Sequence, residues 1–118
     1  MPNPYGAPEI SATESDELLK SEKVWILDVR EEQEFQLARI DHPRVVELPL
    51  SRLANEGAEI VPENLSAQNQ RIVVMCHHGV RSAQVTVWLM NQGWKDVVSM
   101  EGGIAAYAQD VDAAVGTY

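Results

Sequence analysis

Residues 73–84, VVMCHHGVRSAQ, contain the only cysteine of the 118-residue chain. Cys76 ends a run of apolar β-forming residues, and four residues separate it from Arg81. Residues 76–81 can curl so that their backbone N–H groups converge on one point, with Gly79 supplying conformational freedom at the tightest place. Converging amides and the positive end of a following helix bind anions. The first anion here is the Cys76 thiolate itself, so the segment predicts a nucleophile that is ionised at neutral pH.

The neighbours of Cys76 each have a functional interpretation and a plainer alternative. A lone cysteine is commonly an inert core residue, but a polar, glycine-containing loop directly after it favours a reactive thiol. Arg81 pairs either with an anionic substrate or with a carboxylate that braces the loop. His77 and His78 either tune the thiolate and contact a donor, or are ordinary loop residues. No metal site is expected, because three adjacent residues cannot easily surround one ion.

The elements that must position this loop alternate along the chain. Short apolar runs predict strands at residues 23–29, 44–50, 71–76 and 96–100, with Pro49 placing the second of these at a sheet edge. Capping residues and acidic first turns predict helices at residues 10–22, 30–40, 82–92 and 102–115. Residues 55–70 are expected to form an irregular loop or a frayed helix.

This alternation, without a hairpin signal, predicts an α/β fold: a parallel sheet with helices on both faces and right-handed crossovers. Sites in such sheets lie at the carboxyl ends of the strands. Asp28, Cys76 and Glu101 all fall at predicted strand ends. The expected site therefore lies where these ends meet.

The predicted helix at residues 82–92 contains a conflict. Its β-branched run at residues 84–88 favours a strand by propensity alone. A helix is preferred because Gly93 can end it in a left-handed conformation and because four apolar residues share one helical face, namely Val80, Ala83, Val87 and Met90. Further apolar residues off this face predict a helix that is buried on more than one side.

Length and composition indicate one domain, at residues 10–118, after a flexible lead-in at residues 1–9. The 18 acidic residues outnumber the 9 basic ones, and the net charge of −9 argues against nucleic acid or a membrane as partner. One free cysteine fits a reducing compartment, and the opening residues lack the features of a signal peptide. We expect a cytoplasmic protein that uses no cofactor.

Three motifs together resemble the rhodanese-type sulfurtransferases. CHHGVRS at residues 76–82 is similar to their Cys-x-x-Gly-x-Arg/Thr-Ser/Ala active-site loop. LDVREEQEF at residues 27–35 resembles their first signature, and MEGGIAAY at residues 100–107 their C-terminal one. The resemblance extends from about residue 10 to residue 107 and implies a single-domain, rhodanese-like protein.

The resemblance implies a five-stranded parallel sheet and a catalytic Cys76. Cys76 takes a sulfane sulfur from a small donor such as thiosulfate, becomes a persulfide, and passes the sulfur to cyanide, a thiol or a sulfur-accepting protein. The resemblance assigns the active-site loop to the residues that follow it: His77, His78, Gly79, Val80 and Arg81. Asp28 and Arg30 then brace the loop through hydrogen bonds, or else form a routine surface ion pair.

The chain departs from the family pattern in three places. Residues 38–50 replace a Gly-His-Ile-Pro-Gly-Ala-like segment, which leaves the shape of that loop open. Tyr107 stands where the final signature commonly has Trp, which predicts a change in core packing. The positions of His77 and His78 vary with substrate in the family, so a preference for thiosulfate does not follow.

Two other functions compete with sulfurtransferase activity. A sulfur-carrier or sensor module would hold one sulfur on Cys76 and act only with a protein partner. A phosphatase or arsenate reductase would need a Cys-x5-Arg loop to receive three equatorial oxygens. With four residues between Cys76 and Arg81, the cradle is smaller, and this alternative ranks low.

Overall fold

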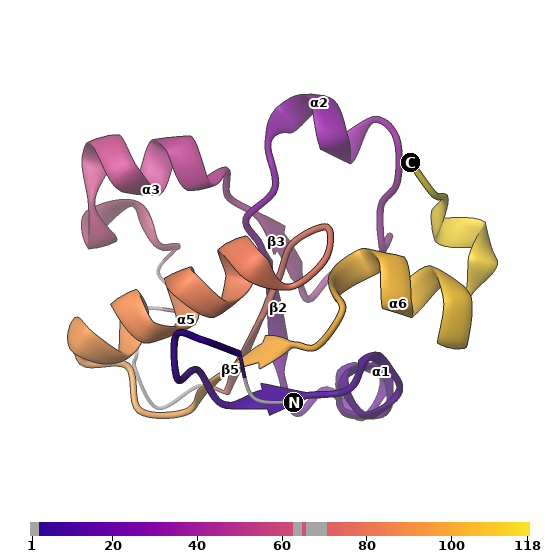
Figure 1. Ribbon diagram of the computed structural model, residues 1–118, viewed down its shortest axis with the longest axis horizontal. Helices are drawn as coiled ribbons and strands as arrows, with labels where there is room; N and C mark the ends of the chain where they lie inside the picture. The colour runs from indigo at the N-terminus through magenta and orange to yellow at the C-terminus, as the bar shows by residue number, and fades with distance from the viewer. Residues whose placement is uncertain (1–2, 63–64, 66–70) are drawn as a thin grey trace.

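The computed structural model describes residues 3–62, 65 and 71–118. Its centre is a five-stranded parallel sheet in the order β1-β5-β4-β2-β3, which confirms the predicted architecture (Figure 1). The strands are β1 (Glu9–Ile10), β2 (Trp25–Asp28), β3 (Val45–Glu47), β4 (Ile72–Met75) and β5 (Val97–Met100). The edge position of β3 was predicted, whereas the two-residue β1 was not located from the sequence, because two residues show no periodicity.

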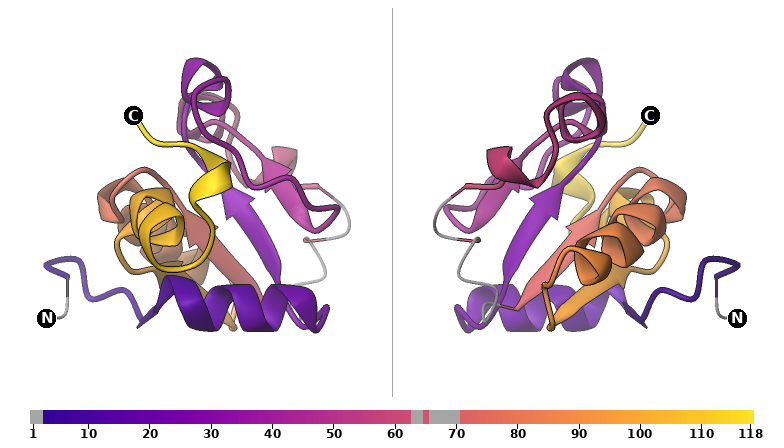
Figure 2. Two further views of the ribbon diagram at one scale, coloured as in Figure 1. Left: turned by 90° about the vertical axis from the view of Figure 1, so that its right-hand side faces the viewer. Right: turned by 90° about the vertical axis from the view of Figure 1, so that its left-hand side faces the viewer.

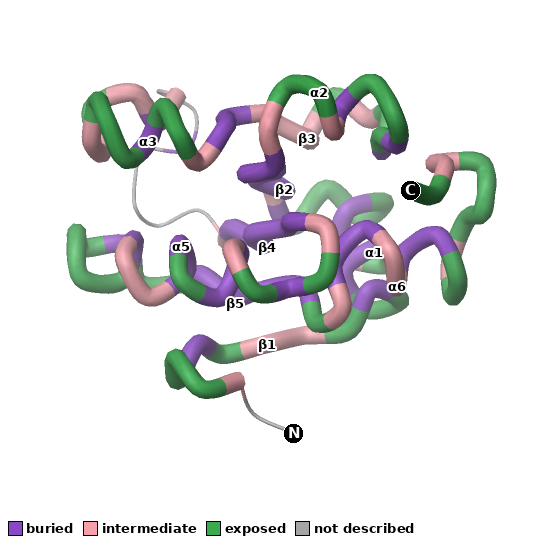
Figure 3. The backbone as a smooth tube through the Cα atoms, turned by 45° about the horizontal axis from the view of Figure 1, so that its top comes forward, coloured by how far each residue is buried: buried purple, intermediate pink, exposed green. Residues whose placement is uncertain are grey.

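Helices cover both faces of the sheet (Figures 1 and 2). The helices α3 (Leu50–Glu56) and α5 (Val80–Asn91) pack on one face, in a cluster that includes Leu27, Val74 and Leu89. The helices α1 (Ala12–Lys20) and α6 (Gly103–Asp110) pack on the other. Burial is concentrated in β2, β4 and β5 (Figure 3). The carboxyl ends of these three strands are thereby held in place from both sides.

The predicted buried face of α5 is wrong. Val80 is 56% exposed and Met90 is 43% exposed, although Ala83 is buried as expected. The helix instead buries Ser82, Ala83, Val85, Thr86 and Leu89. Two hydroxyl groups can lie on this face because each has a partner: Ser82 Oγ lies 2.8 Å from Ser99 Oγ, and Thr86 donates to the Ser82 carbonyl at 2.7 Å. Gly93, with φ +111°, follows the helix as predicted.

Three helices are shorter than predicted, although α1 (Ala12–Lys20) loses only the end residues of its predicted range. The helix α2 is only the turn Glu32–Phe35, because the Arg30 guanidinium binds the carbonyls of Glu34 and Ala38 and the Arg39 amide donates to Val115. The last predicted helix divides into α6 and a 3₁₀ turn, η2 (Ala113–Val115). Asp112 lies between the two. Its side chain caps η2, because Oδ1 accepts a hydrogen bond from the Ala114 amide at 3.0 Å.

The region between β3 and β4 is more regular than expected. The helix α3 follows Pro49, which cannot extend a strand ladder and is well suited to a helix start. A 3₁₀ turn, η1 (Ala58–Ile60), comes next, while residues 63–64 and 66–70 of the predicted irregular segment lie outside the described residues. Across the described ranges, no helix has both the length and the apolar character needed to cross a membrane.

Tyr107 fills the family's tryptophan position as a core residue. Its side chain is buried, and its hydroxyl donates to Asp16 Oδ1 at 2.6 Å, which joins α6 to α1. Burial and the Asp16 carboxylate raise the pKa of Tyr107. The predicted packing role is confirmed, with a polar contact added to it.

Candidate active site

Cys76 lies directly after β4, at the carboxyl edge of the sheet, and is 1% exposed. Two backbone amides point at its Sγ: that of Gly79 at 3.0 Å and that of Ser82 at 3.3 Å. The Ser82 amide belongs to the first turn of α5, where N–H groups have no partner within the helix. The loop therefore surrounds the sulfur with the donors that stabilise a negative charge, as the sequence predicted.

The curl of the loop depends on glycine at position 79. Gly79 has φ +100°, and a Cβ atom there would lie 3.2 Å from the amide nitrogen of Gly102. The carbonyls of the loop are bound on its opposite side by the N-terminus of α6: Ile104 donates to Cys76 O at 2.9 Å and Ala105 donates to His77 O at 3.1 Å. These two hydrogen bonds anchor the start of the loop to α6, while the amides of Gly79 and Ser82, further along the loop, face Sγ.

A pair of buried hydroxyl groups supports the sulfur from the β5 side. The Cys76 thiol donates to Ser82 Oγ at 3.4 Å, and Ser82 Oγ lies 2.8 Å from Ser99 Oγ. Both serines are fully buried. When the sulfur is ionised, Ser99 can donate to Ser82, whose own O–H then donates to the thiolate. The two hydroxyl groups can therefore form hydrogen bonds with Cys76 in both its thiol and its thiolate form.

Arg81 pairs with a carboxylate, the second of the two roles that its position allowed. Its two terminal nitrogens bind both oxygens of Glu34, at 2.5 and 2.9 Å. Glu34 Oε1 also accepts from the Glu31 amide at 3.0 Å, and Oε2 accepts from the Tyr118 hydroxyl at 2.7 Å. The Arg81 hydrogen bonds lower the pKa of Glu34 to about 2, and the same contacts raise the pKa of Arg81.

Asp28 and Arg30 form a buried ion pair, so the alternative of a surface pair is wrong. Arg30 Nε and Nη2 donate to the two Asp28 oxygens at 2.9 and 2.7 Å, and both side chains are at most 1% exposed. The guanidinium also donates to Glu34 O and Ala38 O. Apart from the bonds to Asp28, its hydrogen bonds among the described residues end on Glu34, Ala38 and Tyr118, not on residues 76–81. The pair therefore fixes the segment that carries Glu34, and supports the loop only through it.

His77 is held in an aromatic stack. Its ring lies 3.8 Å from the ring of His78 and 3.8 Å from that of Tyr118. Partial burial and the neighbouring His78 lower the pKa of His77 below its ordinary value. Burial raises the pKa of Tyr118, whose hydroxyl also accepts from Arg30 at 3.2 Å. His78 and Val80 are exposed at the outer rim of the loop.

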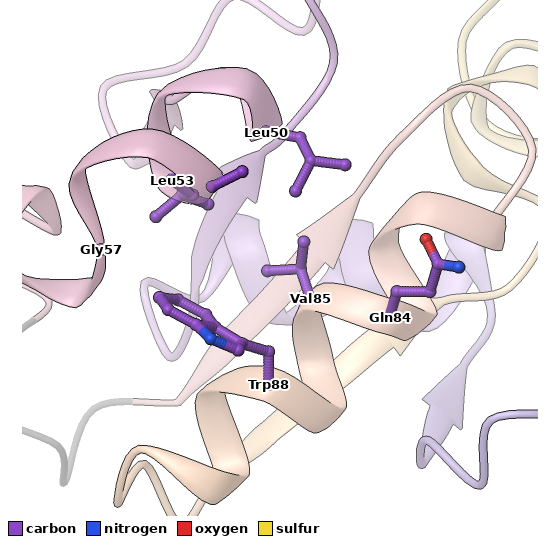
Figure 4. Close-up of a pocket in the computed structure, with 7 residues that line it drawn as sticks. Leu50, Leu53, Gly57, Gln84, Val85 and Trp88 are labelled. Atoms are coloured by element: carbon purple, nitrogen blue, oxygen red, sulfur yellow. The ribbon is translucent and has the colours of Figure 1, made fainter.

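An apolar cavity of about 440 Å³ lies between α3 and α5 (Figure 4). Leu50 and Leu53 line it from α3, and Val85 and Trp88 line it from α5. Val85 is one helical turn beyond Arg81, so the cavity and the loop share one side of α5. The cavity has the size of a small-ligand site.

Four residues of this constellation were not predicted as site residues: Glu34, Ser82, Ser99 and Tyr118. Ser82 stands inside the quoted loop motif, so its position was a usable signal. Glu34 stands inside the quoted motif at residues 27–35, so it also had a usable signal. Ser99 and Tyr118 come from other parts of the chain, and their side-chain types carry no signal by themselves. Of the predicted residues, the structure brings Cys76, Gly79 and Arg81 together at the loop. The pair of Asp28 and Arg30 is connected to the loop only through the Arg30 contacts with Glu34 and Tyr118.

Comparison with known proteins agrees with this geometry. The Rhodanese-like domain model matches residues 11–110, and the chain belongs to that family. It is 36% identical over 93 residues to the Rhodanese-like/PpiC domain-containing protein 12 of Arabidopsis thaliana, and 29% identical over 105 residues to a tRNA uridine(34) hydroxylase of Chlamydia pneumoniae. These matches cover 79% and 89% of this chain, but only 30% and 32% of the two relatives.

The same family includes solved structures of similar size. A rhodanese-related protein from Thermoplasma volcanium superposes with a TM-score of 0.72 at 29% identity, over 88% of this chain and 93% of that one. The chain thus matches a separate rhodanese-like domain along most of its length, and spans about a third of the curated relatives named above.

Proposed function

We propose that this protein is a sulfurtransferase that carries a sulfane sulfur on Cys76. The observation that supports this most directly is the pair of amides, from Gly79 and Ser82, that points at Sγ from a loop anchored on its far side by α6. Membership of the rhodanese-like family supports sulfur transfer in general. These amides stabilise a thiolate, which is the nucleophilic form of cysteine.

The reaction has two displacements. The Cys76 thiolate attacks the outer sulfur of the donor, the donor's sulfur–sulfur bond breaks, and the leaving group departs with the bonding electron pair. A nucleophilic acceptor such as cyanide then attacks the outer sulfur of the persulfide and regenerates the thiolate. The Gly79 and Ser82 amides and the Ser82 hydroxyl would stabilise the negative charge at each stage. No external oxidant is needed, because the transferred sulfur is already at the sulfane level.

The relative from Chlamydia pneumoniae is named a tRNA uridine(34) hydroxylase, which makes hydroxylation of a tRNA uridine a second candidate. The chain spans 32% of that relative, so most of the larger protein has no counterpart here. A net charge of −9 also opposes binding of a polyanion. We therefore place this activity second.

A phosphatase is disfavoured by the Arg81 contacts. An arginine that binds a tetrahedral phosphate must offer its guanidinium to the substrate, whereas both terminal nitrogens of Arg81 are bound to Glu34. The spacing of only four residues between Cys76 and Arg81 also disfavours a phosphatase.

Intact-mass measurement after donor treatment tests the proposal. Wild-type protein should gain one sulfur atom, and Cys76→Ser should gain none, because the chain has no other thiol. Reduction with dithiothreitol should remove the added mass, which separates a persulfide from methionine sulfoxides on the 4 methionines. Formation of thiocyanate from cyanide should require Cys76.

The outcomes separate the candidates. Sulfur gain with rapid thiocyanate formation supports the enzyme. Sulfur gain that transfers only to a protein would identify the carrier module, and Cys76-dependent hydroxylation of tRNA without sulfur gain would favour the second candidate. If Cys76→Ser forms thiocyanate as fast as the wild-type protein, Cys76 is not the residue that carries the sulfur.

A further inference from the structure

The loop carries a single lysine or arginine, and that residue is already paired. Arg81 is the only such residue in CHHGVRS, and Glu34 binds both of its terminal nitrogens. His77 has a lowered pKa, so it adds little positive charge at neutral pH. An incoming sulfur donor therefore meets neutral hydrogen-bond donors, namely the amides and the hydroxyl around Sγ, rather than a free cation.

The Glu34 carboxylate is held where it is by contacts other than Arg81. The Glu31 amide binds one oxygen at 3.0 Å and the Tyr118 hydroxyl binds the other at 2.7 Å. Arg30 in turn binds the Tyr118 hydroxyl and the Glu34 carbonyl. Since the pKa of Glu34 is lowered to about 2, the carboxylate is charged throughout the physiological range. The neutralisation of Arg81 is thus a fixed property of the site.

Charge matters here because the nucleophile is itself an anion. Thiosulfate brings two negative charges to a thiolate, and a free guanidinium beside the loop would offset that repulsion. An organic thiosulfonate, R–SO₂–S⁻, delivers the same outer sulfur with one negative charge. A site without a free cation favours the second donor.

We infer that Glu34 determines the donor specificity of this site: by neutralising Arg81, it selects sulfur donors of low charge, such as organic thiosulfonates, over the thiosulfate dianion. The inference rests on the proposed function. With a thiosulfonate, the Cys76 thiolate bonds to the outer sulfur, the donor's sulfur–sulfur bond breaks, and a sulfinate leaves with the electron pair. With thiosulfate, the leaving group is sulfite. Cyanide removes the sulfur from the persulfide in both cases.

The test is the ratio of kcat/KM for thiosulfate to kcat/KM for methanethiosulfonate, with cyanide as acceptor. Glu34→Gln keeps the side chain's shape and an oxygen for the Glu31 amide, but removes the charge. The ratio should rise about tenfold, equivalent to about 1.4 kcal/mol, with most of the gain in the KM for thiosulfate. The gain should shrink at high salt. A general change in thiolate reactivity affects both donors and cancels in the ratio.

Three further variants make the result specific. Glu56→Gln removes the same charge from a carboxylate that pairs with Arg52 on α3, and should leave the ratio unchanged. Arg81→Gln leaves Glu34 unpaired, so the ratio should fall below that of the wild type. The double variant Glu34→Gln/Arg81→Gln should return the ratio toward the wild-type value. Circular dichroism spectra should match across the series.

The possible outcomes distinguish this inference from the proposed function. If wild-type protein turns over both donors but Glu34→Gln changes both equally, Glu34 is only structural and the specificity inference is overturned. If Arg81→Gln and Glu34→Gln shift the ratio in the same direction, it is also overturned. If turnover is slow, the rate of sulfur gain on Cys76 gives the same ratio. If neither donor places sulfur on wild-type Cys76, the proposed function is wrong and the inference falls with it.

Discussion

Replacing Gly103 with alanine should displace the active-site loop from α6. Gly103 has φ +61°, and a Cβ atom there would clash with Cys76 O and lie 2.5 Å from His77 O. These are the two carbonyls that the next residues of α6, Ile104 and Ala105, bind through their amides. Backbone atoms cannot turn aside as a flexible side chain can, so the helix start and the loop must separate.

The magnitude follows from two contributions. A left-handed conformation costs an alanine roughly 1–2 kcal/mol. Loss or distortion of the two hydrogen bonds from α6 to the loop costs about 1 kcal/mol each. The free energy of unfolding should therefore fall by about 3–4 kcal/mol, a large part of the stability of an ordinary domain.

Gly6 provides the matched control. It also has a positive φ, of +76°, but a Cβ atom there meets nothing within 4 Å. Gly6→Ala should therefore cost only the backbone contribution, about 1–2 kcal/mol, and any effect of alanine on the unfolded chain is common to both variants. Urea unfolding measures both values. If Gly103→Ala is no more destabilising than Gly6→Ala, the close packing of α6 against the loop is not what holds the loop.

Two further predictions concern the charges behind the loop. Arg30→Gln leaves the buried Asp28 carboxylate without its cation and should lower the free energy of unfolding by about 3–5 kcal/mol. Arg39→Gln breaks the exposed pair with Glu47 and should lower the free energy of unfolding far less, so equal shifts in urea midpoint would contradict the argument. Glu34 has a folded-state pKa of about 2, below its ordinary 4.5, so its charged form stabilises the fold above pH 4.5 and this contribution is lost as the pH falls toward 2. The stability difference between wild type and Glu34→Gln should shrink by about 1 kcal/mol over that window, and a pH-independent difference would refute it.

The location of the candidate site could be predicted from local sequence. A run of buried β-formers ends at Cys76, a glycine allows the turn, and a helix that is followed by Gly93 comes next, all within residues 71–93. Each of these signals acts between near neighbours in the chain, through backbone conformation or the period of one element. The alternation of such segments also predicts a parallel sheet, because parallel strands need crossover connections.

The sequence-based predictions failed where they depended on which other elements pack against a helix. The buried face of α5 was predicted from its apolar residues, but Val80 and Met90 are exposed while Ser82 and Thr86 are buried. Hydroxyl groups are buried where a hydrogen-bond partner is available, and the partner of Ser82 is Ser99, on strand β5. No periodicity in residues 80–91 contains that information.

The sequence alone predicted that the cysteine stands at a strand end, before a glycine-containing loop, in an α/β domain, since secondary structure and loop geometry follow from adjacent residues. Only the tertiary structure decided the electrostatic character of the site. Glu34, Arg81 and Tyr118 come from three separate elements, and they meet because the sheet order and the packing of α2 and the C-terminal segment bring them together. A carboxylate was one of the two expected partners of Arg81, but which acidic residue binds it, 47 positions away in the chain, depends on that packing.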